Sequence, residues 1–209
     1  MDAIPESFER YAGGNPRGGL LWDRLLRAWH LRVGIEVDVE RVIVWPDLSC
    51  AGAPEVHGAP LPDDPPASQR PPAKGTGPRL DHASAARDAA RLPHCQLGWV
   101  GADGFPMVTR AEIADVEEHG IVLKTAEGLV PPGARRAGLT AHWFAEFNVG
   151  QRQRIHTGWL DCDGERIVYA PHTRAGYYMP PSKLAYKIGA GVVTTWGLGR
   201  ARRQGFMPA

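Results

Sequence analysis

The sequence contains few cysteines, and none of them is arranged to bind zinc or to form a redox motif. Cys50, Cys95 and Cys162 stand far apart, their number is odd, and no C-x-x-C pair occurs. A disulfide framework and a zinc ribbon are therefore unsupported. The eight histidines include no H-x-x-x-H arrangement and no adjacent carboxylate cluster, so we expect no metal site.

Long apolar runs and an excess of one charge are also missing. No run approaches the roughly 18 residues that span a bilayer, and the segment Met1 to Arg10 lacks the basic-then-apolar pattern of a signal peptide. The formal net charge of +1 gives no electrostatic argument for nucleic acid or a membrane as partner. We therefore expect a cytoplasmic protein with neither of these partners.

What the sequence does contain is a series of short apolar segments separated by turn signals. Asp103-Gly104 predicts a tight hairpin, and Asp163-Gly164 predicts a second one. Strands are expected at residues 96–100, 107–113, 121–125, 139–147, 152–160 and 166–169, followed by a loop over 171–181. An antiparallel meander of five or six strands usually closes into a barrel, which removes its edges. The fold class expected is mainly β, a barrel with few helices.

The segments before the barrel have different compositions. Residues 1–50 are expected to form an extension, with an amphipathic helix around 21–29 and an alternating, half-buried strand from Arg32 to Trp45. Residues 51–80 form a proline-rich arm that cannot make regular ladder or helix hydrogen bonds. We expect this arm to lie along the surface of the barrel domain, residues 81–209.

Capping signals predict two helices within residues 81–209. Asp81 is placed to cap a helix from Ala83 to Arg91, whose alanines favour helix intrinsically. Ser182 is placed to cap a second helix from Lys183 to Ile188, and Gly189 is placed to end it. A final strand is expected at residues 192–196.

An ordered set of residues resembles a known family. Asp103-Gly104-x-Pro106, then Thr125, then Arg152-Gln153 at the start of a later strand are similar to the flavin-binding split β-barrel of pyridoxamine 5'-phosphate oxidase and its relatives. The resemblance covers roughly the last hundred residues. It implies an antiparallel split barrel, a homodimer with the cofactor between subunits, and a flavin mononucleotide (FMN)-dependent oxidoreductase acting on a small-molecule substrate. The resemblance identifies neither the catalytic residues of this chain nor its substrate.

The resemblance also implies which residues hold the cofactor. Gln153 matches a glutamine that contacts the flavin, and Thr125 matches a threonine on the phosphate side. The family's strand arginine and lysine are replaced here by Thr109 and Ala114, and the nearest later basic residues are Arg135 and Arg136. The expected cofactor-binding residues are Thr109, Arg110, Thr125, Arg135, Arg136 and Gln153.

These departures leave two alternatives open. Either Arg135 and Arg136 bind the phosphate from a re-routed loop, or the FMN site is lost. In the second case the chain binds another cofactor, a deazaflavin or haem, or is a non-catalytic ligand-binding protein. Alternation along the strand puts Gln153 on the face opposite Arg154 and His156, where it contacts either a ligand or a second subunit.

Overall fold

The structure is a computed structural model that describes residues 37–144, 150–180 and 182–205. The chain divides into two compact units, residues 39–179 and residues 1–38 with 180–209, and each is described by itself. The helix expected at 21–29, the first part of the strand expected from Arg32, and the end of the strand expected over 139–147 lie outside the described residues.

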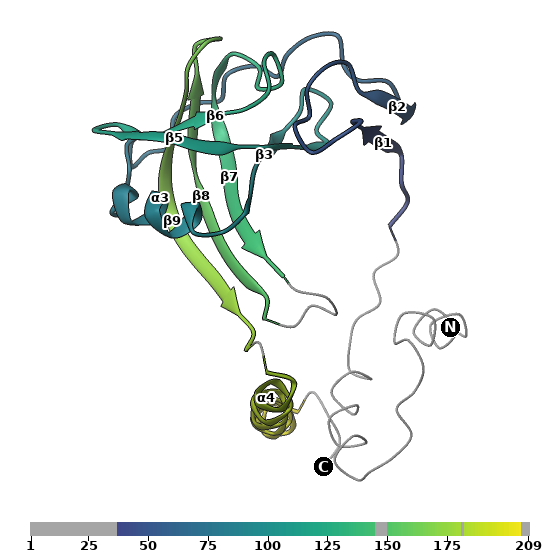
Figure 1. The fold of residues 1–209 in the computed structure, drawn as a ribbon, viewed down its shortest axis with the longest axis vertical. Coiled ribbons are helices and arrows are strands. Elements are labelled where there is room, and N and C mark those ends of the chain that lie inside the picture. Colours follow the sequence, from purple (N-terminus) through teal and green to yellow (C-terminus); the bar gives the residue numbers. More distant parts are fainter. Residues whose placement is uncertain (1–36, 145–149, 181, 206–209) are drawn as a thin grey trace. The chain divides into compact units, whose positions relative to one another are not determined.

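The larger unit is built on one antiparallel sheet in the order β4-β3-β7-β8-β9-β6-β5. It curls into a half-barrel, which confirms the expected mainly β barrel fold (Figure 1). The two edge strands, β4 and β5, are separated in the chain by Ala111 alone, so the curl brings the two ends of the sheet together. The strands are β3 His94–Val100, β4 Pro106–Arg110, β5 Glu112–Glu117, β6 Gly120–Lys124, β7 Gly133–Trp143, β8 Arg152–Cys162 and β9 Ile167–Tyr178.

The core fills the concave face of the sheet. Because side chains alternate between the two faces of a strand, every second residue of β7 is buried, including Ala137, Leu139 and Ala141. Leu97 of β3 and Leu160 of β8 are fully buried in the same cluster. Complete burial of a leucine side chain stabilises the fold by about 1.5–3 kcal/mol.

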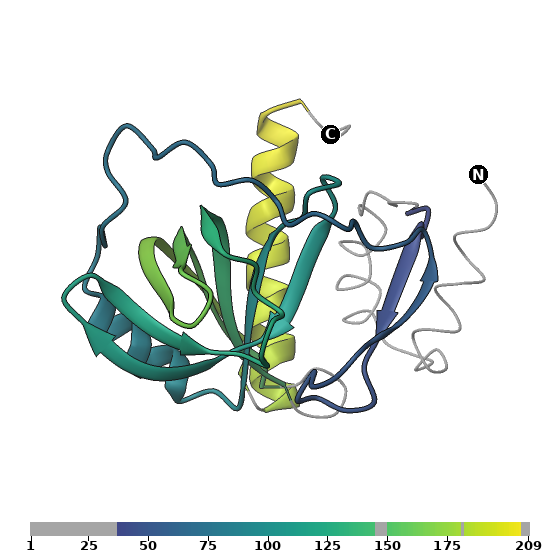
Figure 2. The ribbon, with the colours of Figure 1, turned by 90° about the horizontal axis from the view of Figure 1, so that it is seen from above.

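Helix α3, His82–Ala90, forms where the Asp81 cap predicts it and packs against this core. Asp81 caps it by accepting a hydrogen bond from the Ser84 backbone N–H at 2.9 Å, and such a cap is worth about 1 kcal/mol. Its buried face consists of Ala85, Ala86 and Ala89, whose small side chains let the helix approach the strands closely. The helix contacts β5, β6, β7 and β9, and Figure 2 shows it beside the strands at one end of the half-barrel.

A small hairpin is fastened to the barrel through the Asp-Gly turn. Strands β1, Arg41–Val44, and β2, Glu55–Gly58, pair with each other only. Arg41 forms an ion pair with Asp103 at 2.7 Å and also donates to the Ala59 carbonyl at 2.8 Å. Gly104 provides the positive φ of the turn, +84°. In this fold the acidic residue of the Asp-Gly signal therefore has a structural partner.

The proline-rich arm lies along the barrel, as its composition predicts. The Gln69 N–H donates to the Ala134 carbonyl at 2.7 Å, and the Ala134 N–H donates to Ser68 Oγ at 3.2 Å. Pairing of β7 with β3 begins at Ala137. The arm therefore supplies hydrogen bonds to the part of β7 that precedes Ala137. Farther along the arm, the Arg79 N–H donates to the Pro171 carbonyl at 3.0 Å. One part of the expected arm, Glu55–Gly58, is instead strand β2.

Several predicted strand boundaries in the sheet are wrong. The strand expected from residue 139 already begins at Gly133, as β7. The strand expected over 107–113 is divided at the buried Ala111 into the two edge strands. The loop expected over 171–181 is mostly strand, because β9 continues to Tyr178 after a register shift opposite Thr157 and Gly158. A bulge accommodates Pro171 within a ladder. Gly158 is required there, since a Cβ on it would lie 2.2 Å from the Ala170 carbonyl oxygen.

The strand expected from Arg32 is also corrected where it is described. Only Arg41–Val44 is strand, and Val37 and Val39 are 71% and 72% exposed. The alternating pattern is present in the sequence, but the described part of this stretch before Arg41 has no pairing strand. Alternation indicates a sheet face only where a partner strand and a core exist.

In the other unit, α4 spans Lys183–Arg203 and Ser182 caps it as expected. The helix does not end at Gly189, and the strand expected at 192–196 is wrong because those residues are helical. The β-branched run Val192-Val193-Thr194-Thr195 has strand propensity, but this preference is weak and is overridden by the helix that the Ser182 cap begins. Among the described residues, no helix is both long and apolar enough to cross a membrane.

Candidate functional site

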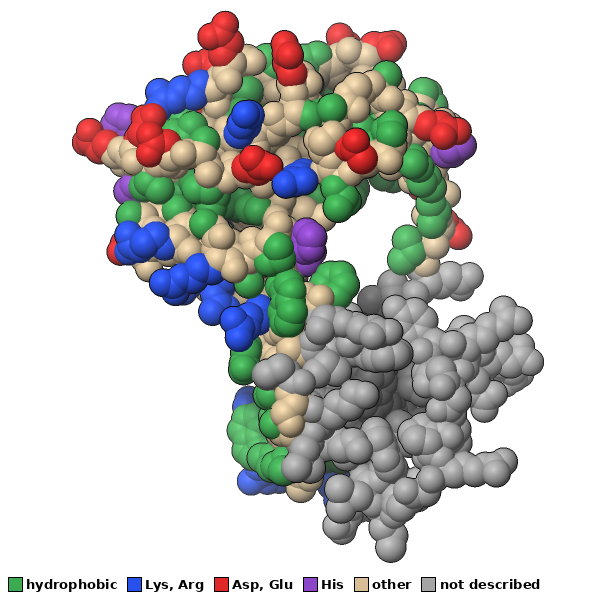
Figure 3. Space-filling view, in the orientation of Figure 1, with side chains coloured by type: hydrophobic (Ala, Val, Ile, Leu, Met, Phe, Trp, Pro, Cys, Tyr) green, Lys and Arg blue, Asp and Glu red, His purple; other side chains and the backbone are tan. Residues whose placement is uncertain are grey.

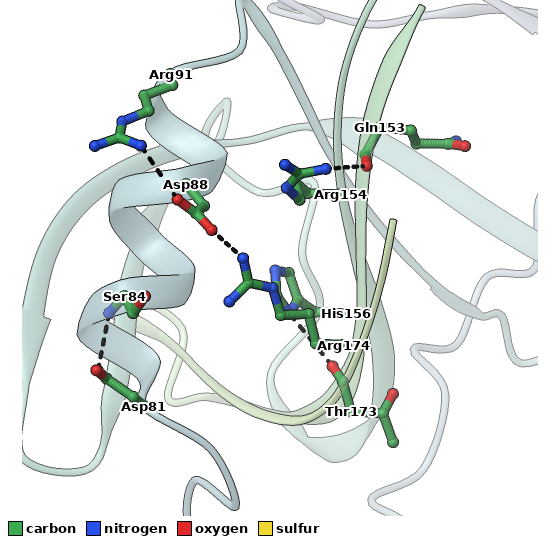
Figure 4. Close-up of polar contacts among 9 residues, drawn as sticks. All are labelled: Asp81, Ser84, Asp88, Arg91, Gln153, Arg154, His156, Thr173 and Arg174. Atoms are coloured by element: carbon green, nitrogen blue, oxygen red, sulfur yellow. Dashed lines mark hydrogen bonds and ion pairs between the residues drawn. The ribbon is translucent and has the colours of Figure 1, made fainter. Parts of the chain in front are cut away.

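The candidate site lies on the concave face of β8 and β9 next to α3. Alternation puts Arg154 and His156 on this face and Gln153 on the other, as predicted from the sequence. Figure 4 shows Arg154 and His156 directed to the side of α3, whereas Gln153 points away. Three rows of register partners cross β7, β8 and β9 here: Leu139, His156, Arg174; Ala141, Arg154, Gly176; and Trp143, Arg152, Tyr178.

We call Asp88, Arg154, His156 and Arg174 the arginine cluster. Asp88 on α3 forms ion pairs with Arg174 and, at 3.5 Å, with Arg91 (Figure 4). Arg174 and Arg91 thus share a single carboxylate, and Arg154 adds a positive charge that has no carboxylate partner among the described residues. Figure 3 shows Lys and Arg side chains gathered along the lower end of β9. The cluster therefore carries excess positive charge and is suited to an anion.

His156 lies at the base of the cluster and is fully buried. Its Nδ1 is 3.3 Å from the Thr173 carbonyl oxygen. Because a carbonyl only accepts, Nδ1 carries the proton and Nε2 presents a lone pair. Within the described part of the chain, Nε2 is buried without a hydrogen-bond partner.

The charge state of His156 follows from its surroundings. Burial lowers the pKa of His156, and the positive charges of Arg174 and Arg154 act in the same direction. The hydrogen bond to Thr173 and the charge of Asp88 oppose this shift in pKa. The imidazole is therefore neutral at neutral pH and is able to accept a hydrogen bond or a proton.

Arg154 has small neighbours on both sides in its row. Its neighbours across the sheet are Ala141 and Gly176, the two smallest side-chain types. A Cβ on Gly176 would lie 3.0 Å from Arg154 Nη1, and this nitrogen donates to the Gln153 carbonyl at 3.1 Å. Gly176 therefore allows the guanidinium to lie against the sheet.

The outermost row adds aromatic rings to this face. Arg152 lies over the Tyr178 ring, with 5.5 Å between the guanidinium carbon and the ring centroid. Tyr178 is 55% exposed, and Trp143 is half-buried. Rings next to arginines provide both a stacking surface and charged donors for a planar anionic ligand.

The expected cofactor-binding residues do not converge in the structure. Thr109 is buried in the core, where its Oγ1 has no partner among the described residues. Arg110 is exposed and pairs with Glu112 at 2.9 Å. The Thr125 hydroxyl donates to the adjacent Ala126 carbonyl at 3.1 Å. Each of these three side chains thus has a separate environment.

The two consecutive arginines of β7 are directed to opposite faces of the sheet. Arg135 is 1% exposed, and its Nη2 donates to the carbonyls of Pro132 and of Pro66 in the arm. Burial lowers the pKa of Arg135. Arg136 is exposed, and its backbone N–H donates to Gln69 Oε1 at 3.0 Å. Because both belong to a strand and not to a re-routed loop, they cannot grip one phosphate together.

With Gln153 on the opposite face from the arginine cluster, the six residues do not form one phosphate site within a chain. Sequence reasoning identified the alternation on β8 but passed over the face that carries Arg154 and His156. The signal was present in Arg152-x-Arg154-x-His156 and His172-x-Arg174. The sequence alone did not show that strand pairing sets Arg174 beside His156.

In residues 37–144, 150–180 and 182–205, no group of three or more His, Cys, Asp or Glu side chains is placed to hold a metal ion. No protein-family model matches the chain, and no significant match is found among curated proteins or solved structures.

Proposed function

We propose that the arginine cluster binds the anionic group of a small-molecule cofactor, and that FMN is the first candidate. The resemblance to the split barrel of pyridoxamine 5'-phosphate oxidase supports this choice, as does the half-barrel fold. The observation that carries the proposal is the surplus of arginine around His156, whose buried Nε2 has no partner among the described residues. The chain would then be a flavin-dependent oxidoreductase acting on a small molecule.

Each residue of the cluster would make a different contact with the bound molecule. The guanidinium groups of Arg154 and Arg174 would donate charge-assisted hydrogen bonds to the phosphate, which carries close to two negative charges at neutral pH. The Nε2 lone pair of His156 would accept a hydrogen bond from the bound molecule. Trp143 and Tyr178 would offer aromatic surface to a planar ring. A bound flavin supplies the redox chemistry itself.

The alternative cofactors have the same requirement for positive charge. A deazaflavin cofactor carries phosphate and haem carries carboxylates, so either anion would suit the arginine cluster. A non-catalytic protein that retains only anion binding is the remaining alternative. An absorbance spectrum of the purified protein, with the released ligand identified by its mass, separates these cases because each chromophore absorbs differently.

The binding test compares FMN with riboflavin, which lacks the phosphate. Replacing both Arg154 and Arg174 with Ala should weaken FMN binding, by about 1.5–3 kcal/mol for each charged hydrogen bond lost, and leave riboflavin binding nearly unchanged. Flavin fluorescence quenching measures both affinities. Arg136→Ala is the matched control, because Arg136 is also an exposed arginine of the same sheet.

The outcomes separate the alternatives. A loss confined to FMN in the double variant supports the arginine cluster. A loss in Arg136→Ala places the phosphate on the outer face of β7. Equal loss of both ligands in the double variant means that the arginines support the fold. If the unsubstituted protein binds neither ligand, FMN is rejected in favour of a deazaflavin, haem or a non-catalytic role.

We also propose that the protein is a two-fold homodimer. The aromatic residues Trp143, Phe144, Phe147 and Trp159 would together offer more surface than one small barrel can bury. Of these, Trp159 is 3% exposed and therefore needs no partner subunit. Phe144 and Tyr177 are 53% and 47% exposed, and together they support the proposal. Phe147 lies outside the described residues. Light scattering that shows a monomer at micromolar concentration would reject the dimer.

A further inference from the structure

Two histidines far apart in the sequence face each other on the outer side of the sheet. His94 is the first residue of β3, and its register partner on β7 is His142. Their ring centroids are 5.4 Å apart, and the ring planes are inclined at 35°. Pairing between strands therefore brings together two imidazoles that are too far apart in the sequence to form a recognisable motif.

The histidine pair is accessible, and the orientation of one ring is supported. His94 is exposed and His142 is half-buried. Phe144 stacks on His142, with ring centroids 5.9 Å apart and planes inclined at 5°. Neither imidazole makes a hydrogen bond within the part of the chain that the structure describes. The ring nitrogens therefore remain available to an external ligand.

The separation of the rings suits a shared metal ion. A Zn²⁺ ion lies about 2.0–2.1 Å from each imidazole nitrogen in a tetrahedral site. Two imidazoles bound in this way have centroids roughly 5 Å apart, close to the observed 5.4 Å. Imidazole nitrogen is a preferred ligand of zinc, nickel and copper, whereas magnesium and calcium prefer oxygen.

We propose that His94 and His142 bind a divalent transition-metal ion on the outer face of the sheet. Two protein nitrogens are supplied, and water completes the coordination, because no larger ligand group exists among the described residues. Gln153, the register partner of His142 on β8, places an amide side chain on the same face. The site is separate from the arginine cluster, which lies on the concave face.

Calorimetric titration of the full chain with Zn²⁺ alone, and separately with Ni²⁺, tests this site. The unsubstituted protein should bind one ion through the pair. His94→Ala and His142→Ala should each lower the affinity for the metal ion by at least ~10-fold. Substituting a residue that only hydrogen-bonds a metal ligand already costs this much, and loss of a ligand should cost no less. His119→Ala is the matched control, because His119 is an exposed histidine on the turn between β5 and β6 and should leave the affinity unchanged.

A second measurement needs no substitution and covers the case in which a variant fails to fold. Diethylpyrocarbonate modifies accessible histidines, and mass spectrometry locates the modified residues. Zn²⁺ should protect His94 and His142 and leave His119 reactive. The proposal is overturned if Zn²⁺ protects neither residue of the pair, or if folded His94→Ala and His142→Ala variants bind it as tightly as the unsubstituted protein.

Discussion

Asp88 of α3 and Arg174 of β9 form an ion pair across 86 residues of sequence. Asp88 is the acidic member of a cluster otherwise composed of Arg154, Arg174 and His156. The pair joins the helix to the sheet and also neutralises part of the charge that an anionic ligand would use. Asp88 therefore competes with such a ligand for Arg174.

Replacing Asp88 with Asn should raise the affinity for FMN severalfold, because Arg174 loses its internal counter-ion. The free energy of unfolding should fall by about 1 kcal/mol or less, as expected for a pair that is partly exposed. Fluorescence titration and urea unfolding measure the two effects. Asp64→Asn, at an exposed position of the arm, is the control for a change in total charge. Weaker binding in Asp88→Asn would show that Asp88 positions Arg174 and does not compete for it.

The stability of the fold should decrease on mild acidification through His156. Its folded-state pKa is lowered by burial, so the unfolded chain binds more protons as the pH falls through the ordinary histidine value of about 6.5. This contribution to stability is fully present above about pH 6.5 and is lost as the pH falls toward the lowered folded-state pKa.

Urea unfolding between about pH 5 and 8 tests this contribution. His156→Gln should be less stable at neutral pH, and its free energy of unfolding should depend less on pH across this range. His119→Gln should retain the pH dependence of the unsubstituted protein, since His119 is exposed. An unchanged pH dependence in His156→Gln would contradict the assignment.

Protease should cut the arm near residues 63–68 without separating the fragments. Gln69 and Arg79 hold the segment after the cut to β7 and β9, and the ion pair of Arg41 with Asp103 holds the segment before the cut to the barrel. Gln69→Ala removes the acceptor of the Arg136 N–H, which costs about 1 kcal/mol, and should speed this cleavage. Lys74→Ala changes an exposed arm residue and should not. Gel filtration after limited proteolysis measures the association. A barrel that stays folded after losing the N-terminal fragment would show that the arm is dispensable.

The thiols should differ in reactivity, because the thiolate is the reactive form. Burial raises the pKa of Cys95 to about 11, and Cys162 is 3% exposed. Iodoacetamide at about pH 8, near the ordinary cysteine pKa, should label the half-buried Cys50 first and the other two slowly until the protein unfolds. Mass spectrometry over time distinguishes the three sites, and early labelling of Cys95 would be inconsistent with its raised pKa.

The sequence predicted those features that depend on a few neighbouring residues. Asp81 and Ser182 were placed correctly as caps because a cap needs only its own side chain and the next turn of backbone. The hairpin at Gly104 needs only a residue that accepts positive φ. Period-two alternation correctly separated Gln153 from Arg154 and His156, since it follows from strand geometry alone.

Tertiary structure decided which of those faces became concave and which residues met across strands. The curl of the sheet buries His156, and the bulge near Gly158 sets the register that brings Arg174 beside it. The pairing of β3 with β7 brings His94 to His142, and the register of β8 with β7 gives Arg154 a small neighbour, Ala141. These contacts join segments tens of residues apart, and they form because closing the barrel buries the core. Local propensity and spacing carry no information about such long-range pairing.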